Sequence, residues 1–150
     1  MDPVVVRSAE PRDAFSVAAL HLQAERERGE SIPQGFLDTL ADAWLRDRSR
    51  QSWLAEDLRH NPLGAAHGTV VRTLPTPREG STAWMHLGFL YVTADARGQG
   101  LGSELLHTVL TWCEARDVGR VQLNALEQTR GLYERAGFGP PAHALMERRL

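Results

Sequence analysis

Residues 92–106 read "VTADARGQGLGSELL", and this stretch decides which fold the chain can have. An apolar, strand-like run ends at Val92, and a helical leucine pattern begins at Leu101. Three glycines stand between and just inside these two segments, at positions 98, 100 and 102. Glycine loses more conformational entropy on folding than any other residue, so this spacing implies that something approaches the backbone closely. A strand, a glycine-rich turn and a helix start together form an anion site, because the first helical amides have no internal partner and the helix dipole is positive there.

The spacing of the glycines excludes two common phosphate-binding loops. A P-loop needs GxxxxGK[ST], and this loop has no lysine. The dinucleotide fingerprint needs GxGxxG and an acid at the end of the next strand, whereas here the spacing is GxGxG and the next run ends in "NAL" at 124–126. Arg97 adds positive charge at the rim, so a phosphate or pyrophosphate is the expected ligand. Taken alone, the loop is equally consistent with a merely tight strand-to-helix turn.

The rest of the chain predicts alternating strands and amphipathic helices around this loop. Expected strands, from β-branched and apolar runs, cover residues 4–7, 52–56, 63–72, 83–92, 120–126 and 144–150. Expected helices, from apolar residues at i, i+3, i+4 and i+7, cover residues 11–28, 37–45, 101–118 and 127–136. The segment "LPTPREGST" is expected to be an exposed loop. This order predicts an α+β (mixed α/β) fold. Gly88 lies inside an expected strand, which often marks a bulge.

Composition limits the classes of function. A chain of 150 residues suits one domain over residues 1–150. The formal net charge of -2 gives no basic field for nucleic acid, and no apolar run is long enough for a membrane span. The one cysteine, Cys113, excludes an internal disulfide and fits a reducing, cytoplasmic setting. Six histidines stand apart without zinc-type spacing, so no metal is expected.

Two motifs together resemble the GNAT superfamily, the acetyl-CoA-dependent N-acetyltransferases. Arg97, Gly100 and Gly102 match the family pattern [RQ]-x-x-G-x-[GA]. "LYERAGF" at 132–138 resembles the C-terminal element of the family. The resemblance covers about residues 84–139, and it implies a central, mostly antiparallel, splayed sheet flanked by helices. It also implies direct transfer of acetyl from acetyl-CoA to a primary amine in a ternary complex.

The resemblance assigns the cofactor-binding residues. In this family the loop amides hold the CoA pyrophosphate, and the strand before the loop pairs with the pantetheine arm. The loop residues that carry over are Arg97, Gly98, Gln99, Gly100, Leu101, Gly102 and Ser103, and the strand residues are Leu90, Tyr91 and Val92. Asn124 could bond the cofactor amides, or it could cap the following turn.

The resemblance also suggests the catalytic groups. Tyr133 matches the family tyrosine that protonates the leaving thiolate, although a core tyrosine is the alternative. His86 stands where some relatives carry a glutamate base. Strand alternation puts His86 on one face with Gly88 and Leu90, unless a bulge resets the register. The alternatives to His86 as the base are Glu56, His67, Glu25 or a chain of waters. Cys113 continues an apolar helical stripe and is not expected to act as a nucleophile.

The partner of the reaction stays open at this stage. The expected acceptor is a small-molecule or peptide amine. Neither nucleic acid nor a membrane is expected as a partner. The chain could form a homodimer. Two alternatives remain: a non-catalytic acyl-CoA-binding or sensor module on the same fold, and a nucleotide- or phosphate-binding domain of another class.

Overall fold

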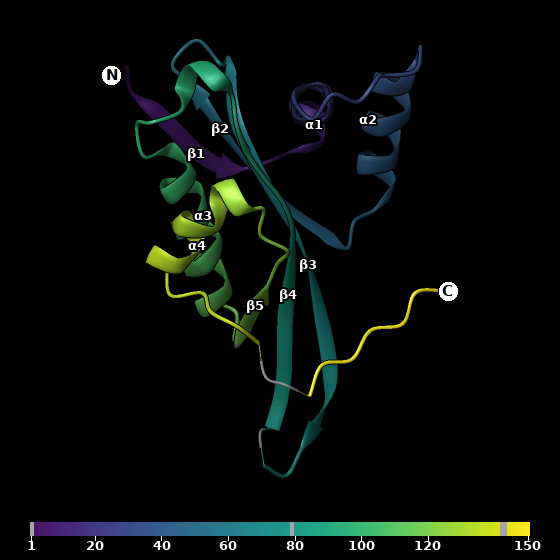
Figure 1. Cartoon of the computed structure of the whole chain (residues 1–150), viewed down its shortest axis with the longest axis vertical. Coiled ribbons are helices and arrows are strands. Elements are labelled where there is room, and N and C mark those ends of the chain that lie inside the picture. The colour runs from purple at the N-terminus through teal and green to yellow at the C-terminus, as the bar shows by residue number, and fades with distance from the viewer. Residues whose placement is uncertain (1, 79, 142–143) are drawn as a thin grey trace.

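Within residues 2–78, 80–141 and 144–150, which the computed structural model describes, five strands form one sheet in the order β1-β2-β3-β4-β5 (Figure 1). Their bounds are β1 Val4–Ser8, β2 Arg50–Asp57, β3 Pro62–Thr76, β4 Gly80–Val92 and β5 Arg120–Gln122. Neighbouring strands are antiparallel from β1 to β4, whereas β5 runs parallel to β4. The prediction of a mixed α+β fold with a mostly antiparallel central sheet is therefore confirmed.

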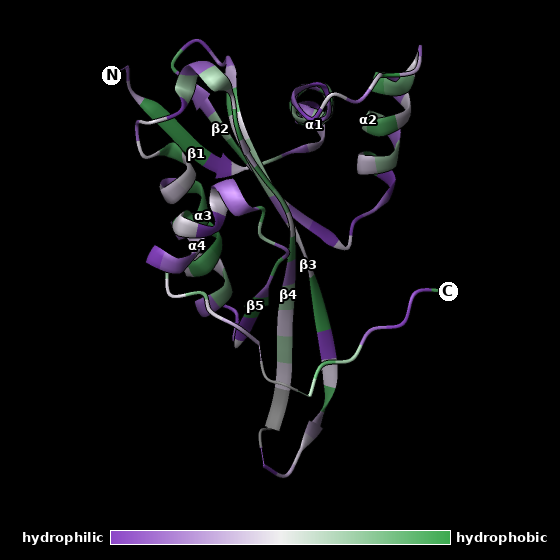
Figure 2. Cartoon of the chain, viewed as in Figure 1, coloured by the Kyte–Doolittle hydropathy of each residue, from purple (hydrophilic) through white to green (hydrophobic). Residues whose placement is uncertain are grey.

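Helices cover both faces of the sheet. The helices are α1 Ala14–Glu27, α2 Phe36–Arg46, α3 Leu101–Glu114 and α4 Arg130–Arg135. Figure 1 shows α1 and α2 on one side of the sheet and α3 and α4 on the other. In Figure 2 the first part of β1 is apolar, whereas α4 is largely hydrophilic, as its exposure requires.

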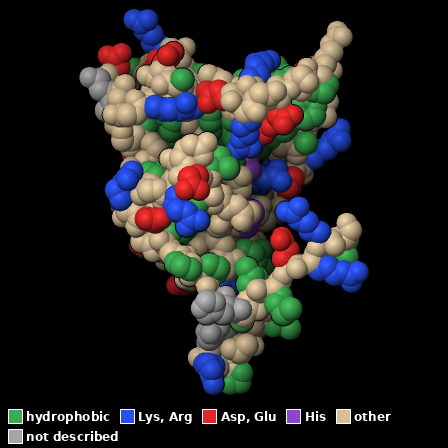
Figure 3. Space-filling model, viewed as in Figure 1, with side chains coloured by type: hydrophobic (Ala, Val, Ile, Leu, Met, Phe, Trp, Pro, Cys, Tyr) green, Lys and Arg blue, Asp and Glu red, His purple; other side chains and the backbone are tan. Residues whose placement is uncertain are grey.

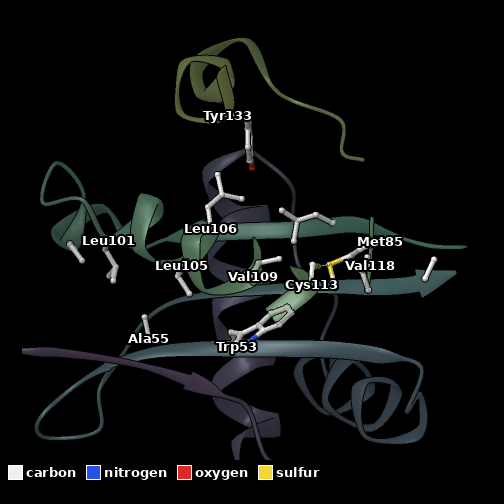
Figure 4. Packing of buried hydrophobic residues seen from close by; sticks show 14 residues of the cluster. Trp53, Ala55, Met85, Leu101, Leu105, Leu106, Val109, Cys113, Val118 and Tyr133 are labelled. Atoms are coloured by element: carbon white, nitrogen blue, oxygen red, sulfur yellow. Dashed lines mark hydrogen bonds between the residues drawn. The ribbon is translucent and has the colours of Figure 1, made fainter. Parts of the chain in front are cut away.

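A separate apolar layer lies under each pair of helices. The larger one packs α3 and α4 on the sheet, and its members Trp53, Met85, Leu105 and Val109 are at most 1% exposed. Figure 4 shows Tyr133 of α4 standing over α3, with Trp53 of β2 on the opposite side of that helix. The smaller layer joins α1 to the sheet through five buried residues, Leu20, Ala24, Leu54, Ala65 and Tyr91. Each fully buried large aliphatic side chain contributes about 1.5–3 kcal/mol of transfer free energy, so both layers hold the sheet rigidly.

An irregular pairing in β4 opens the sheet. On the β3 side, His67 pairs with Phe89 and Gly68 with Leu87, which leaves Gly88 as the extra residue of a β-bulge. On the other side, β4 pairs with β5 only from Trp84 to His86. The bulge predicted at Gly88 and the splayed sheet are thus confirmed, and the splay begins where the bulge lies.

Several predicted boundaries were wrong. The expected strand 120–126 ends at Gln122, the expected helix 101–118 ends at Glu114, and the stretch 144–150 forms no strand in the described chain. The helix ends early because Asp117 turns the chain with a positive φ of 55°, and Gly119 then donates to the Ala83 carbonyl. The short β5 leaves little edge for a further strand. Conversely, β3 and β4 continue into "LPTPREGST", because paired antiparallel strands extend each other.

Candidate functional site

The glycine loop turns sharply between β4 and α3. After a 3-10 turn over Ala94–Ala96, the chain passes through Gly98 and Gly100, whose φ angles are 76° and 84°. Side chains rarely adopt this left-handed region, so both positions require glycine. No described atom lies within 4 Å of the place where a Cβ would stand on either glycine. The loop backbone is therefore open to a ligand.

The N-terminus of α3 offers unpaired amides. The first internal bond of this helix runs from the Glu104 amide to the Gly100 carbonyl, and no described side chain caps the helix. The amides of Leu101, Gly102 and Ser103 precede that bond and point out of the helix end. Since the macrodipole is positive here, the residues fit an anion such as a pyrophosphate. The Leu101 side chain is 4% exposed and belongs to the core, so only its backbone is available.

Gly102 differs from the other two loop glycines. It lies within α3, and a Cβ on it would meet Leu132 of α4 at 3.6 Å and Val92 of β4 at 3.9 Å, which are ordinary contacts. Neither backbone strain nor a clash within the chain therefore demands glycine. Gly102 therefore lies close to Leu132 and Val92, where α3, β4 and α4 meet.

Arg97 is tied back to α1 rather than lying free at the rim. Its Nε donates to the Val92 carbonyl at 2.9 Å, and its Nη2 donates to Glu27 Oε2 at 2.5 Å. The Tyr91 hydroxyl donates to the other oxygen of Glu27 at 2.6 Å. These bonds, from Tyr91 first and Arg97 second, lower the pKa of Glu27, while burial and Glu27 raise the pKa of Tyr91 to about 12. The start of the loop is thereby fixed to the end of α1.

The edge of β4 beyond the bulge faces no described strand. Leu90 and Val92 pack partly buried against the layer under α3, whereas Phe89 and Tyr91 pack toward α1. Their backbone groups on the β5 side lie past His86, where the pairing with β5 ends. An extended ligand could add to this edge as a further strand.

Tyr133 of α4 packs into the apolar layer under α3 and α4. Its ring is 9% exposed and packs edge-on against Phe138, with 5.7 Å between the ring centres. In Figure 4 its hydroxyl turns from α4 toward the sheet. No group in the described part of the chain hydrogen-bonds that hydroxyl. Burial raises the pKa of Tyr133, so the phenol keeps its proton at neutral pH and can donate it.

Histidines gather on the α1 side of the bulge. His67 Nε2 and His21 Nε2 lie 2.9 Å apart, and the ring of Phe89 stacks on His21 at 3.7 Å between centres. His86 is exposed, and its Cδ2 lies 3.8 Å from the Cβ position of Gly88. Burial lowers the pKa of His21 to about 4 and that of His67 to about 3. Both rings of the pair are therefore neutral at physiological pH.

Comparison with known proteins agrees with this arrangement. The model of the acetyltransferase (GNAT) family matches residues 17–138. This chain belongs to the GNAT family. No curated protein matches it significantly.

Solved structures share the fold of this GNAT chain at low identity. A "predicted acetyltransferase with acetyl-CoA" from Clostridium acetobutylicum has a TM-score of 0.76 and 17% identity, covering 97% of this chain and 96% of that one. A ribosomal-protein-alanine N-acetyltransferase from Brucella melitensis has a TM-score of 0.75 and 24% identity, covering 98% and 100%. A glucosamine-6-phosphate N-acetyltransferase from Arabidopsis thaliana has a TM-score of 0.73 and 14% identity, covering 98% and 99%.

The β-bulge at Gly88 changes which face of the sheet the later residues of β4 occupy. His86 and Gly88 share the α1 side as expected, but Leu90 lies on the α3 side, contrary to simple alternation. The extra residue at Gly88 resets the register by one position.

Other residues considered from the sequence lie outside this arrangement. Asn124 is exposed and falls two residues beyond the end of β5. Glu56 is bound by Arg7 and His60, and the bond from Arg7 lowers its pKa, so its carboxylate is already engaged within the fold. Cys113 is 2% exposed, and burial raises the pKa of its thiol.

A cavity of about 460 Å³ lies on another side of the loop. Gln99 and Leu101 line it together with four carboxylate residues, Asp2, Asp57, Asp95 and Glu104. Four like charges repel a pyrophosphate, so the cavity is unsuited to that anion. In the described ranges no histidine, cysteine and carboxylate cluster could hold a metal, and no helix has the length and apolarity for a membrane span.

Sequence reasoning missed two features of the site. Glu27 was not among the predicted site residues, but its carboxylate binds Arg97 and Tyr91. His21 gave no signal at all, because its partner His67 is 46 positions away. Only tertiary packing of α1 on β3 brings the two rings together.

The histidine pair predicts acid-sensitive stability. As the pH falls from about 6.5 to about 4.5, the unfolded chain binds protons at both histidines, whereas the fold keeps them neutral down to about 4 for His21 and about 3 for His67. We expect the free energy of unfolding, measured in urea, to fall over this window. His67→Phe should flatten the fall, and the exposed His107→Gln should leave it unchanged; equal slopes in the wild type and His67→Phe would contradict the prediction.

Proposed function

We propose that this protein transfers the acetyl group of acetyl-CoA directly to a primary amine. One observation carries the proposal: an open loop with unpaired helix amides follows immediately on the strand that loses its neighbour at a bulge. The amides suit the pyrophosphate, and the free strand edge suits the extended pantetheine arm. The two features meet at Val92, so a single ligand can use both.

In this proposal, different residues of the loop make different contributions to acetyl-CoA binding. Gly98 and Gly100 give the backbone its left-handed turns, and the amides of Leu101, Gly102 and Ser103 face the phosphates. Gln99 is exposed at the rim, where its side chain can add a polar contact. The acetyl-CoA named with the Clostridium acetobutylicum structure supports this assignment.

The strand residues position the thioester. Backbone groups of Leu90, Tyr91 and Val92 hold the pantetheine amides, and an amide near Leu90 polarises the acetyl carbonyl. The amine nitrogen then bonds to the carbonyl carbon while the carbon–sulfur bond breaks. Tyr133 donates its phenolic proton to the departing sulfur and regains one from the amine or water. The buried Cys113 takes no part, which favours direct transfer.

The fold alone does not determine which amine receives the acetyl group. The Brucella melitensis relative is named for the alanine of a ribosomal protein, and the Arabidopsis thaliana relative for glucosamine 6-phosphate. Both share this fold at comparable TM-scores. The proposal therefore covers a primary amine of a small molecule or a peptide, and both kinds must be tried.

The direct test measures thiol release from acetyl-CoA with a panel of amines that includes amino sugars, polyamines and peptides with different N-terminal residues. Release that depends on an amine, with the acetylated product found by mass spectrometry, supports the proposal. Binding of acetyl-CoA without release from any amine would favour the non-catalytic acyl-CoA module. Binding is read independently as a thermal shift, since a ligand at 100 times its Kd adds about 2.7 kcal/mol. A shift with ATP or NAD but none with acetyl-CoA would refute the cofactor assignment.

A larger side chain at Gly102 should block the cofactor without harming the fold. The position is helical, and a Cβ there makes only ordinary contacts with Leu132 and Val92, so Gly102→Leu should keep the melting temperature within a few degrees. We expect its Kd for acetyl-CoA, measured by calorimetry, to rise more than tenfold. Gly102→Ala is the matched control, because the family pattern admits alanine there, and its Kd should change little. An unchanged Kd in Gly102→Leu would remove this turn of α3 from the site.

Removing the Tyr133 hydroxyl should slow the chemical step. Tyr133→Phe keeps the ring packed on Phe138, so we expect the Kd for acetyl-CoA to hold while kcat falls roughly 100-fold, as for other general acids. Phe138→Leu serves as the packing control and should lower the melting temperature more than kcat. If kcat of Tyr133→Phe stays at the wild-type level, the tyrosine is structural.

A further inference from the structure

Three imidazoles converge on the bulge from the α1 side. The Cε1 and Nδ1 atoms of His67 lie 3.6 and 3.8 Å from the place where a Cβ would stand on Gly88, and His86 Cδ2 lies 3.8 Å from it. His21 of α1 lies behind His67, Nε2 to Nε2, at 2.9 Å. Figure 3 shows histidine side chains at the surface on the side of the sheet that carries α1 and α2.

The bulge is where an acceptor must meet the strand edge. Beyond His86 the edge of β4 has no described partner strand, and Gly88 brings no side chain of its own. A molecule that reaches this edge from the α1 side comes into contact with the His67 and His86 rings. Among these rings, His67 is the one fixed in place, because Phe89 stacks on it with 5.3 Å between ring centres and His21 bonds it.

Because both rings are neutral, the hydrogen positions of the His21–His67 pair are restricted. An Nε2-to-Nε2 bond between two neutral imidazoles holds one hydrogen, so one ring donates through Nε2 and the other accepts there. The rings must then be opposite tautomers, with one Nδ1 carrying a hydrogen and the other a lone pair. When His67 is the Nε2 donor, its Nδ1 lone pair faces the bulge.

We propose that His67 Nδ1 accepts the proton of the acceptor ammonium, and that His21 is a positioning residue that passes a proton onward. This inference rests on the proposed acetyl transfer. The amine gives one proton to His67 Nδ1, the Nε2 hydrogen of His67 moves to His21 Nε2, and the Nδ1 hydrogen of His21 leaves to water. The pair ends neutral with its tautomers exchanged, and proton exchange with water restores them. The freed lone pair of the amine then attacks the thioester carbon.

The groups around His21 and His67 favour passing a proton on over keeping one ring as an imidazolium. Arg28 and Arg50 face His21, and His86 and Arg50 face His67, so a lasting imidazolium in the pair would meet other positive or ionisable groups. A proton that passes through leaves no such charge behind. His86, by contrast, is exposed and has no hydrogen-bond partner in the described part of the chain.

The test compares His67→Ala, His67→Phe and His86→Ala in the full chain with the best amine of the panel. We expect kcat/KM for the amine to fall at least 100-fold in both His67 variants, while the Kd for acetyl-CoA stays within about twofold. His67→Phe keeps an aromatic ring in the stack and guards against a folding defect. Free imidazole should restore part of the rate to His67→Ala and none to His67→Phe. The exposed His107→Ala is the matched control and should keep the wild-type rate.

The positioning role of His21 has its own readout. His21→Phe keeps a ring against Phe89 but removes the neighbour that lowers the pKa of His67, so the acid limb of kcat/KM should move to higher pH. Full activity in both His67 variants, with loss in His86→Ala, would overturn the proposal while the acetyl transfer itself stood. A wild-type chain inactive with every amine would refute the proposed function and this inference together.

Discussion

The site depends on how early the β4–β5 pairing ends. Parallel strands usually continue side by side, but here the pairing covers only Trp84 to His86, and the bulge at Gly88 turns β4 away two residues later. Beyond this point β4 is held from both faces: α1 packs on Phe89 and Tyr91, while Leu90 and Val92 pack into the layer under α3. The free backbone edge, the loop after Val92 and the histidines at the bulge all follow from this one departure from regular pairing.

The charge near the loop is arranged so that backbone amides, rather than a side chain, provide the positive potential. Glu27 neutralises Arg97 at 2.5 Å, and the same carboxylate takes the Tyr91 hydroxyl. Arg97 is still half-exposed, so donors of its guanidinium that do not bind Glu27 remain accessible. The shared carboxylate joins the end of α1 to the start of the loop.

Local pattern was enough to place β1 to β4, the start of α3 and the bulge, because each depends on neighbours in sequence. Gly88 is an example: a glycine within a strand has few reasons to be there, and the pairing gives the expected one. Contacts between residues far apart in the sequence were not predicted. Glu27 lies 70 positions from Arg97, and His21 lies 46 from His67, so no period of 2 or 3.6 residues links them.

A neutral imidazole suits the base that we propose at the bulge better than a carboxylate in the place of His67 would. A carboxylate in the place of His67 would carry a full charge into the stack with Phe89, and burying an unpaired charge costs several kcal/mol. A neutral imidazole still presents a lone pair but avoids most of that cost. Burial disfavours the protonated state, so the proposed relay requires that the proton pass on. In that relay His21, 2.9 Å away, takes the proton from His67.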